Sequence, residues 1–417
     1  MGGLGLSQPI GRRLFFGLLY LSEGAPIGYV WWAMPTRLRQ AGMPVEEVSA
    51  LIAMLTLPWA FKFLWAPAID RLRGPRFGYR GWITVAQVMM GLTLLPFGVL
   101  GAEAISEWAT LLLLMHAFSA ATQDVGIDAL AIATIPESER AQTTGWMQAG
   151  MLMGRAVFGG VALAAECWIG AEAVVLVLIG VIWATLVMLW LMPGVNAETR
   201  ASDRAERQPF FRVLGRVLGR RSTWLGIGIA LIAGAGFEAV GGLIGPMLSD
   251  AGASKEAVGY YLAIPVVLLM IVGGLAGGRV ADRLGHRRVL IWCIAIISCF
   301  SGLISLLMRL ETIHPYVLMS AAGPIYLLIG CMIASSYALF MDLSEVSIGG
   351  TQFSAFMGAT NLCEVWAVAL AGGLAGSFGY SIGFSATAAL SLLAIPLVVW
   401  LPAPSKATAS ETISTGV

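Results

Sequence analysis

Residues 278–288 read Gly-Arg-Val-Ala-Asp-Arg-Leu-Gly-His-Arg-Arg, a short basic segment with long apolar runs on both sides. A segment with this many arginines is expected to stay out of the bilayer, in a loop on the cytoplasmic side, where Lys and Arg are in excess. Its core, Asp282-Arg283-Leu284, occurs once before as Asp70-Arg71-Leu72, about 210 positions earlier. The repeat predicts two halves with the same order of helices.

The composition predicts an integral membrane protein. Of the 417 residues, 58% are hydrophobic and 12% are charged, which leaves too little charge to cover a soluble surface of this size. The net charge of +1 suggests no nucleic-acid partner. Because lipid satisfies no backbone hydrogen bonds, the apolar runs are predicted to be helices. About twelve runs have the length that crosses a bilayer, at residues 14–38, 47–68, 81–101, 108–135, 141–165, 171–192, 222–249, 256–277, 289–309, 315–341, 350–376 and 379–402.

The fold class is therefore an all-α membrane protein with two pseudo-symmetric six-helix halves. Arginines concentrate in the loops of one side, which predicts that both termini are cytoplasmic. We expect an N-terminal half over 1–192, a cytoplasmic basic linker over 193–221, a C-terminal half over 222–404 and a disordered tail over 405–417. Two interpretations of the end of the linker remain open, an interfacial helix against the inner leaflet or a solvated connection.

Nothing in the sequence predicts a cofactor, a metal site or enzymatic chemistry. The five cysteines lie in apolar runs and are expected to be small buried side chains. The three histidines are scattered, whereas a membrane-embedded transferase would need a His constellation at one face. The Gly-rich residues 273–278 lack the GK[ST] of a nucleotide loop and are expected to pack helices closely.

Acidic residues within the predicted spans are the first functional candidates. Asp124 and Asp128 are four residues apart, so they share one face of a helix. With a rise of about 1.5 Å per residue, Asp124 lies about 18 Å and Asp128 about 12 Å from the inner face. Glu23 lies about 15 Å and Arg155 about 21 Å deep. A buried arginine needs a counter-ion, so we expect Arg155 to pair with Asp124, while Asp128 or Glu23 exchanges a proton; a purely structural ion pair is the alternative.

The other candidates are polar residues at similar depth. Lys62, near the inner end of the second span, either takes part in the site or extends toward the interface. Glu238 lies at nearly the same offset in the second half as Glu23 in the first, and Glu364 nearly matches Arg155. The second half is therefore expected to form the more acidic wall. Two amide side chains complete the set, Gln123 and Asn361.

The segment 278–288 resembles the GxLaDRxGrk loop of the major facilitator superfamily. In physical terms, the aspartate of such a loop caps a neighbouring helix or pairs with arginine, and so holds one conformation. A simple positive-inside anchor is the alternative. The resemblance assigns this latch to Gly278, Asp282, Arg283, Gly285 and Arg287 and, in a degenerate first copy, to Asp70 and Arg71.

Three further segments resemble AmpG-type permeases, a branch that also includes acetyl-CoA transporters and siderophore importers. They are Glu23-Gly24-Ala25-Pro26, residues 61–70 (Phe-Lys-Phe-Leu-Trp-Ala-Pro-Ala-Ile-Asp) and residues 121–129 (Ala-Thr-Gln-Asp-Val-Gly-Ile-Asp-Ala). The resemblance implies a permease of the bacterial cytoplasmic membrane that imports a polar organic solute with alternating access, and we expect a monomer. Because carboxylates within the spans can titrate, we expect proton symport, and a sodium gradient or facilitated diffusion remains open. A muropeptide-like solute and a siderophore both remain open, because muropeptide permeases tend to be longer than this chain. An exporter or facilitator of another small solute is a further alternative.

Overall fold

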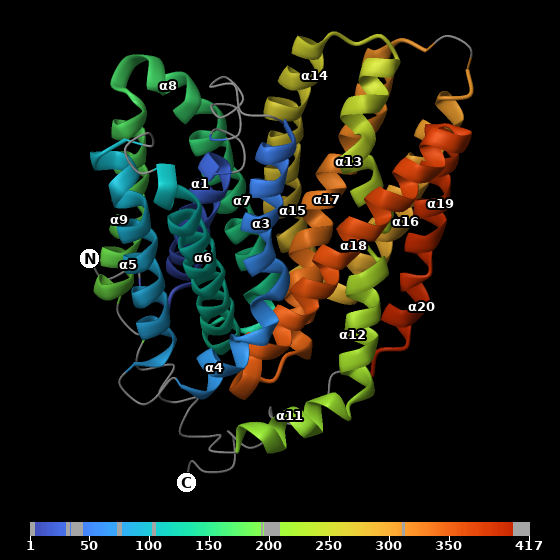
Figure 1. Cartoon of the computed structure of the whole chain (residues 1–417). Helices are drawn as coiled ribbons and strands as arrows, with labels where there is room; N and C mark the ends of the chain where they lie inside the picture. The colour runs from blue at the N-terminus through green and yellow to red at the C-terminus, as the bar shows by residue number, and fades with distance from the viewer. Residues whose placement is uncertain are drawn as a thin grey trace.

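The computed structural model describes residues 5–30, 34, 45–72, 77–101, 106–192, 195, 209–310 and 313–402. Figure 1 shows an all-helical bundle in which the blue-to-green helices stand on one side and the yellow-to-red helices on the other. This arrangement confirms the predicted all-α fold with two groups of spans. The domain boundaries remain a prediction, since most of the linker and the whole tail from residue 405 lie outside the described residues.

The first group of helices matches the first six predicted spans. It consists of α1 (Pro9–Gly28), α3 (Val45–Phe61) with the 3₁₀ turn η2 (Lys62–Leu64) and α4 (Ala66–Arg71), α5 (Gly78–Val99), α6 (Ser106–Thr134), α7 (Arg140–Ala156) with the π-helical η4 (Val157–Val161) and α8 (Ala162–Ile169), and α9 (Ala171–Leu191). The 3₁₀ turn η3 (Glu137–Glu139) joins α6 to α7.

The second group matches the last six. It consists of α12 (Arg221–Ile232) with α13 (Ala235–Asp250), α14 (Lys255–Tyr261) with η5 (Leu262–Val266) and α15 (Val267–Leu284), α16 (His286–Leu307), α17 (Pro315–Leu343), α18 (Gly349–Phe378), and α19 (Tyr380–Leu392) with α20 (Ala394–Val399). The 3₁₀ turn η6 (Val346–Ile348) precedes α18, and α11 (Phe210–Leu218) precedes α12.

Polarity is distributed unequally between the spans. In the described part of the chain, eight helical segments are long and apolar enough to cross a membrane by themselves. The predicted spans that do not reach this standard are α1, α3–α4, α6 and α7–α8, all in the first group. These spans carry Glu23, Lys62, Asp124, Asp128 and Arg155. The piece of the second span from Met54 to Leu64 is apolar but short, so that span falls below the standard by length and not by polarity.

The second span is interrupted at the point where Lys62 lies. Helix α3 ends at Phe61, and α4 restarts at Ala66 with Pro67 in its first turn. A proline is tolerated there because the first turn of a helix leaves its N–H groups unpaired. Lys62 therefore sits in a 3₁₀ turn between two helical pieces.

Glycines bring helices into backbone contact, both within and between the two groups. A Cβ atom on Gly150 of α7 would collide with the carbonyl oxygen of Gly17 of α1, and one on Gly278 of α15 would collide with that of Ala141 of α7. The contact of Gly278 confirms the close packing expected for the run 273–278. Gly241, by contrast, has no atom within 4 Å of such a Cβ.

Both ends of the described chain lie beside the basic loops. Arg12, at the start of α1, forms an ion pair with Glu139 of η3, with 2.8 Å between Nη2 and Oε1. Arg287, at the start of α16, donates a hydrogen bond of 2.8 Å from Nη1 to the carbonyl oxygen of Leu401. The chain thus begins and ends at the same face, as a cytoplasmic position of both termini requires.

Helix α11 runs crosswise at this face, below the bundle in Figure 1. Its Val213 and Val217 are buried against Ile348, and Arg220 pairs with Glu345 at 2.6 Å. The end of the linker is therefore a helix that contacts the bundle. Glu345, between α17 and η6, is thus paired with a basic residue of the linker's end.

The cysteines correct one expectation. All five are free, but Cys167 and Cys299 are exposed and not buried. Both are on helices whose outer faces are apolar, where a cysteine is tolerated as a small hydrophobic side chain.

Candidate functional site

A buried ion pair connects the second and fourth spans. The Lys62 ammonium donates a hydrogen bond to Oδ2 of Asp124, and it lies 3.9 Å from Oδ2 of Asp128. The three residues are only 3%, 4% and 1% exposed, respectively. The break after α3 allows this geometry, because Lys62 faces α6 from a turn and does not have to extend along a helix.

Asp128 has a second partner on the first span. The Tyr20 hydroxyl donates a hydrogen bond to its Oδ1, and Tyr20 is 2% exposed. One lysine thus serves two carboxylates, and a tyrosine hydroxyl satisfies the second. The spacing of Asp124 and Asp128 placed them on one face of α6, as predicted. Tyr20 was not among the predicted site residues, since an aromatic residue in an apolar run has no distinguishing pattern.

The predicted pair between Arg155 and Asp124 is wrong. Asp124 pairs with Lys62, because the helix break brings the lysine to it, whereas depth counting compares heights and not directions. Among the residues that the structure describes, Arg155 Nε has no hydrogen-bond partner, and neither has Oε2 of Glu23. Glu23 is nevertheless the anion that interacts most strongly with Arg155. Glu23 is 1% exposed and lies on α1, next to the ion pair.

A second polar chain runs through the same layer. Gln123 donates a hydrogen bond of 3.1 Å to the Ser22 hydroxyl, and Gln87 donates one of 3.0 Å to Thr185. Gln87 also lies 3.4 Å from Ser22, so side chains of α6, α1, α5 and α9 form one network. Gln123 therefore positions helices, while Ser22 and Gln87 were missed because small polar residues are common within spans.

The second group of helices contributes acidic residues of different exposure. Glu238 on α13 is half-buried, Asn361 on α18 is half-buried and Glu364 on α18 is exposed. Glu238 interacts electrostatically with Glu364, and Glu364 with Arg155 of the first group. Glu364 therefore faces the opposite group of helices. An exposed carboxylate in the middle of a span needs water, which agrees with an acidic wall on this side.

The aspartates of the two basic loops both cap helices of the opposite group. Asp282 accepts hydrogen bonds of 2.9 Å from the backbone N–H groups of Ala141 and Gln142, in the first turn of α7. Asp70 accepts hydrogen bonds from the N–H groups of Gly350 at 3.2 Å and Thr351 at 2.6 Å, in the first turn of α18. The first copy is degenerate in sequence, yet its aspartate caps a helix in the same way.

The remaining residues of the predicted latch have other roles or none in this conformation. Gly278 allows α15 to approach α7, and Gly285, with φ +96°, makes the turn into α16. Arg283 is exposed. Arg71 is exposed too, with its guanidinium 5.5 Å from the centre of the Phe211 ring of α11. Arg287 holds the C-terminal end of the described chain, as noted above.

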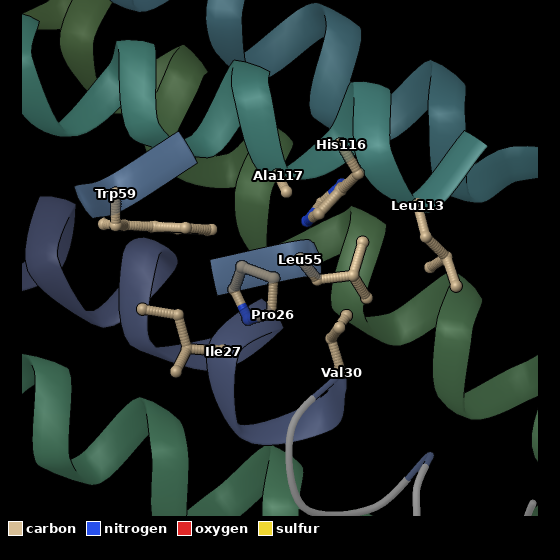
Figure 2. A pocket seen from close by; sticks show the side chains of 8 residues that line it. All are labelled: Pro26, Ile27, Val30, Leu55, Trp59, Leu113, His116 and Ala117. Carbon is tan, nitrogen blue, oxygen red and sulfur yellow. The ribbon is translucent and has the colours of Figure 1, made fainter. Parts of the chain in front are cut away.

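His116 lies at a small internal cavity near the outer end of α6. Its Nδ1 lies 3.1 Å from the Met90 carbonyl oxygen, and the ring points toward Pro26 and Leu55 in Figure 2. The cavity has a volume of about 10 Å³, roughly the space for the centre of one water molecule. It is too small for an organic solute, and His116, which is 2% exposed, is a packed side chain.

Comparison with known proteins extends over most of the chain. The family profile described as Major Facilitator Superfamily matches residues 226–416, and that described as Acetyl-coenzyme A transporter 1 matches residues 14–133. An anhydromuropeptide permease of Escherichia coli (strain K12) is 27% identical, over 93% of this chain and 79% of its own length. A putative transporter AmpG 4 of Rickettsia felis is 21% identical, over 93% of this chain and 96% of its own.

The fold is similar to that of FucP, a transporter crystallised in its outward conformation. The TM-score is 0.73 at 12% sequence identity, and the match covers 94% of this chain and 99% of that one.

Proposed function

Because the chain belongs to the major facilitator superfamily, a family of transporters and not of enzymes, we propose that it imports a polar organic solute into the cytoplasm by proton symport. The chain is a multi-pass membrane protein and a secondary transporter related to the muropeptide permeases. The solute, the coupling ion, the bacterial cytoplasmic membrane and a monomeric state are our proposals.

The observation that supports proton coupling is the buried cluster of Lys62, Asp124, Asp128 and Tyr20. One ammonium group faces two carboxylates, so one negative charge is left for the Tyr20 hydroxyl to stabilise. A proton on either aspartate would neutralise the cluster and leave Lys62 with a single anionic partner. Such a cluster has two charge states that differ by one proton, and coupling to a proton gradient requires a group of this kind.

Glu23 and Arg155 extend the cluster toward the space between the two groups of helices. Within the described chain, Oε2 of Glu23 and Nε of Arg155 have no hydrogen-bond partner. We therefore assign these two side chains to binding of the solute or of a second proton. Glu238 and Glu364 form the opposite wall. Two carboxylates there disfavour a strongly anionic solute such as a coenzyme A ester and accept one with a cationic or hydroxyl-rich part.

For the solute we propose a muropeptide-like molecule, with a siderophore as the alternative. The relative from Escherichia coli, similar over 93% of this chain, is an anhydromuropeptide permease. A sugar–peptide conjugate combines hydroxyl, amine and carboxylate groups, which suits a site with both Arg155 and acidic residues. The resemblance to siderophore importers supports the alternative.

The test is uptake into proteoliposomes. With the lumen at about pH 8 and the medium at about pH 6, a labelled anhydromuropeptide should accumulate, up to about 100-fold for one proton per solute. A protonophore should abolish this accumulation, and an excess of unlabelled ferric siderophore should leave it unchanged. Uptake that ignores the gradient would contradict proton symport, and competition by the siderophore would favour the alternative solute.

The variant Asp124→Asn separates coupling from folding. It should lose accumulation while it still exchanges labelled for unlabelled solute across the membrane without a gradient. Glu107→Gln is the matched control, because Glu107 is an exposed carboxylate on the same helix, α6. This variant should accumulate the solute normally. Normal accumulation by Asp124→Asn would remove Asp124 from the proton path.

A further inference from the structure

His286 connects two carboxylates at the basic face of the protein. Its Nδ1 lies 2.6 Å from Oδ2 of Asp342 on α17, and its Nε2 lies 3.1 Å from Oδ1 of Asp282 on α15. The side chains of His286 and Asp282 are only 10% and 9% exposed, and that of Asp342 is 27% exposed. The contact is therefore shielded from water more than an ordinary surface ion pair is.

Each of the two carboxylates also holds the first turn of α7, in the other group of helices. Asp282 accepts hydrogen bonds from the backbone N–H groups of Ala141 and Gln142, as described above. Asp342 pairs with Arg140, with 2.7 Å between Oδ1 and Nη1. His286 thus contacts both of the carboxylates that bind the second group of helices to the first turn of α7.

The geometry requires both ring nitrogens of His286 to be donors. An ionised carboxylate accepts hydrogen bonds and donates none. Asp282 accepts hydrogen bonds from two N–H groups and Asp342 accepts one from an arginine, contacts that a carboxylate makes as an acceptor. A neutral imidazole has one N–H, so its other nitrogen would turn a lone pair toward a carboxylate oxygen. Only the imidazolium form satisfies both contacts.

The contact of Asp282 and Asp342 with the first turn of α7 is called the inner gate here, because it joins the two groups of helices at the basic face. We propose that His286 is a proton-binding site of this gate, separate from the carboxylates of the membrane interior. The gate is held closed while His286 carries its proton. Loss of the proton from His286 turns one attractive contact into a repulsive one, and the grip on α7 loosens. Closure is therefore strongest at low cytoplasmic pH and weakens as that pH rises. The chain would open inward more readily in an alkaline cytoplasm.

The charged groups around His286 support this direction. Among the described residues, Asp282 and Asp342 are the anions that act on it, Arg140 lies beyond Asp342, and Arg287 interacts with Asp342 from the same helix. The neighbouring Arg283 points into solvent. Two anions in direct contact outweigh cations that lie one residue further away.

The equivalent loop of the first half contains a natural comparison. Asp70 caps α18 in the same way, and among the described residues it also accepts hydrogen bonds from the Tyr79 hydroxyl at 2.9 Å and the Thr351 hydroxyl at 2.6 Å. A tyrosine hydroxyl does not change its charge near neutral pH.

Hydrogen exchange on the purified protein without solute or gradient tests the proposal. After division by the intrinsic exchange rate, protection of the peptide 138–147 should fall at least tenfold between about pH 7 and about pH 9.5. His286→Arg keeps a permanent charge and should remove this step, whereas His286→Gln should show the lower protection at both pH values. An identical step in His286→Arg, or full protection of His286→Gln at pH 7, would overturn the proposal.

Histidine NMR reads the protonation of wild-type His286 itself. The chain has three histidines, so the labelled ring signals can be assigned with single variants of the other two, His116 and His314. His286 should be fully protonated, with two ring N–H protons, at about pH 7, where a histidine with the usual midpoint of about 6.5 is mostly neutral. A neutral His286 at pH 7 would refute the proposal. The inference rests on the chain being a gated transporter, but neither measurement involves solute or symport, so failure here and failure of proton symport are distinguishable.

Discussion

Replacement of Lys62 by methionine tests the buried cluster most directly. Methionine keeps the length and apolar volume of the lysine stem, so the change removes little besides the charge. Asp124 would lose the ammonium group that now donates to it, and Asp128 would keep only the Tyr20 hydroxyl. At 4% and 1% exposure, neither aspartate can recover a partner from bulk water.

The expected loss of unfolding free energy is set by whichever costs less, an unpaired Asp124 charge or protonation of Asp124. A buried charge without its partner costs about 3–5 kcal/mol. Protonation avoids that cost, but a free aspartate has a pKa of about 3.9 and each pH unit is worth 1.36 kcal/mol, so the proton costs about 4 kcal/mol at pH 7 and about 1.5 kcal/mol at pH 5. The variant should therefore be less stable than the wild type by about 4 kcal/mol at pH 7, and the difference should shrink on acidification.

The assay is reversible unfolding of the detergent-solubilised protein at the two pH values. The double variant Lys62→Met/Asp124→Asn is the control, since it removes both charges of the pair. It should recover most of the lost stability at pH 7, to within about 1.5 kcal/mol of the wild type. If Lys62→Met is within about 0.5 kcal/mol of the wild type at pH 7, or if its deficit is the same at pH 5, the reasoning is refuted.

Two further predictions concern packing and the first basic loop. Gly150→Ala should lower the free energy of unfolding by about 3 kcal/mol or more, because the new Cβ collides with the backbone of Gly17. Gly160→Ala is the control and should unfold like the wild type, since no atom lies within 4 Å of its Cβ. Equal stability of the two variants would contradict the close contact. Asp70→Asn should weaken the hydrogen bonds from Thr351 and lower the free energy of unfolding by about 1 kcal/mol. The first turn of α18 should then exchange its amide hydrogens faster. Unchanged protection of that turn would show that the aspartate is not its cap.

The sequence by itself determined the fold and the functional layer. Apolar runs that are long enough to cross a bilayer have to be helices, and the repeat of Asp-Arg-Leu at Asp70 and Asp282 reveals the two halves. Period and composition are local properties, so they can be read without coordinates. For the same reason, Asp124 and Asp128 were recognised as neighbours on one face of a helix.

Only the tertiary structure decided which charges meet. Arg155 has a suitable depth to pair with Asp124, but Lys62 forms the pair, because a 3₁₀ turn before Pro67 directs it toward α6. Depth along a helix is set by residue count, whereas direction depends on where helices break and how closely glycines allow them to approach. The bridge from His286 to Asp342 joins residues more than fifty positions apart and arises from the packing of α15, α16 and α17, which no local pattern encodes.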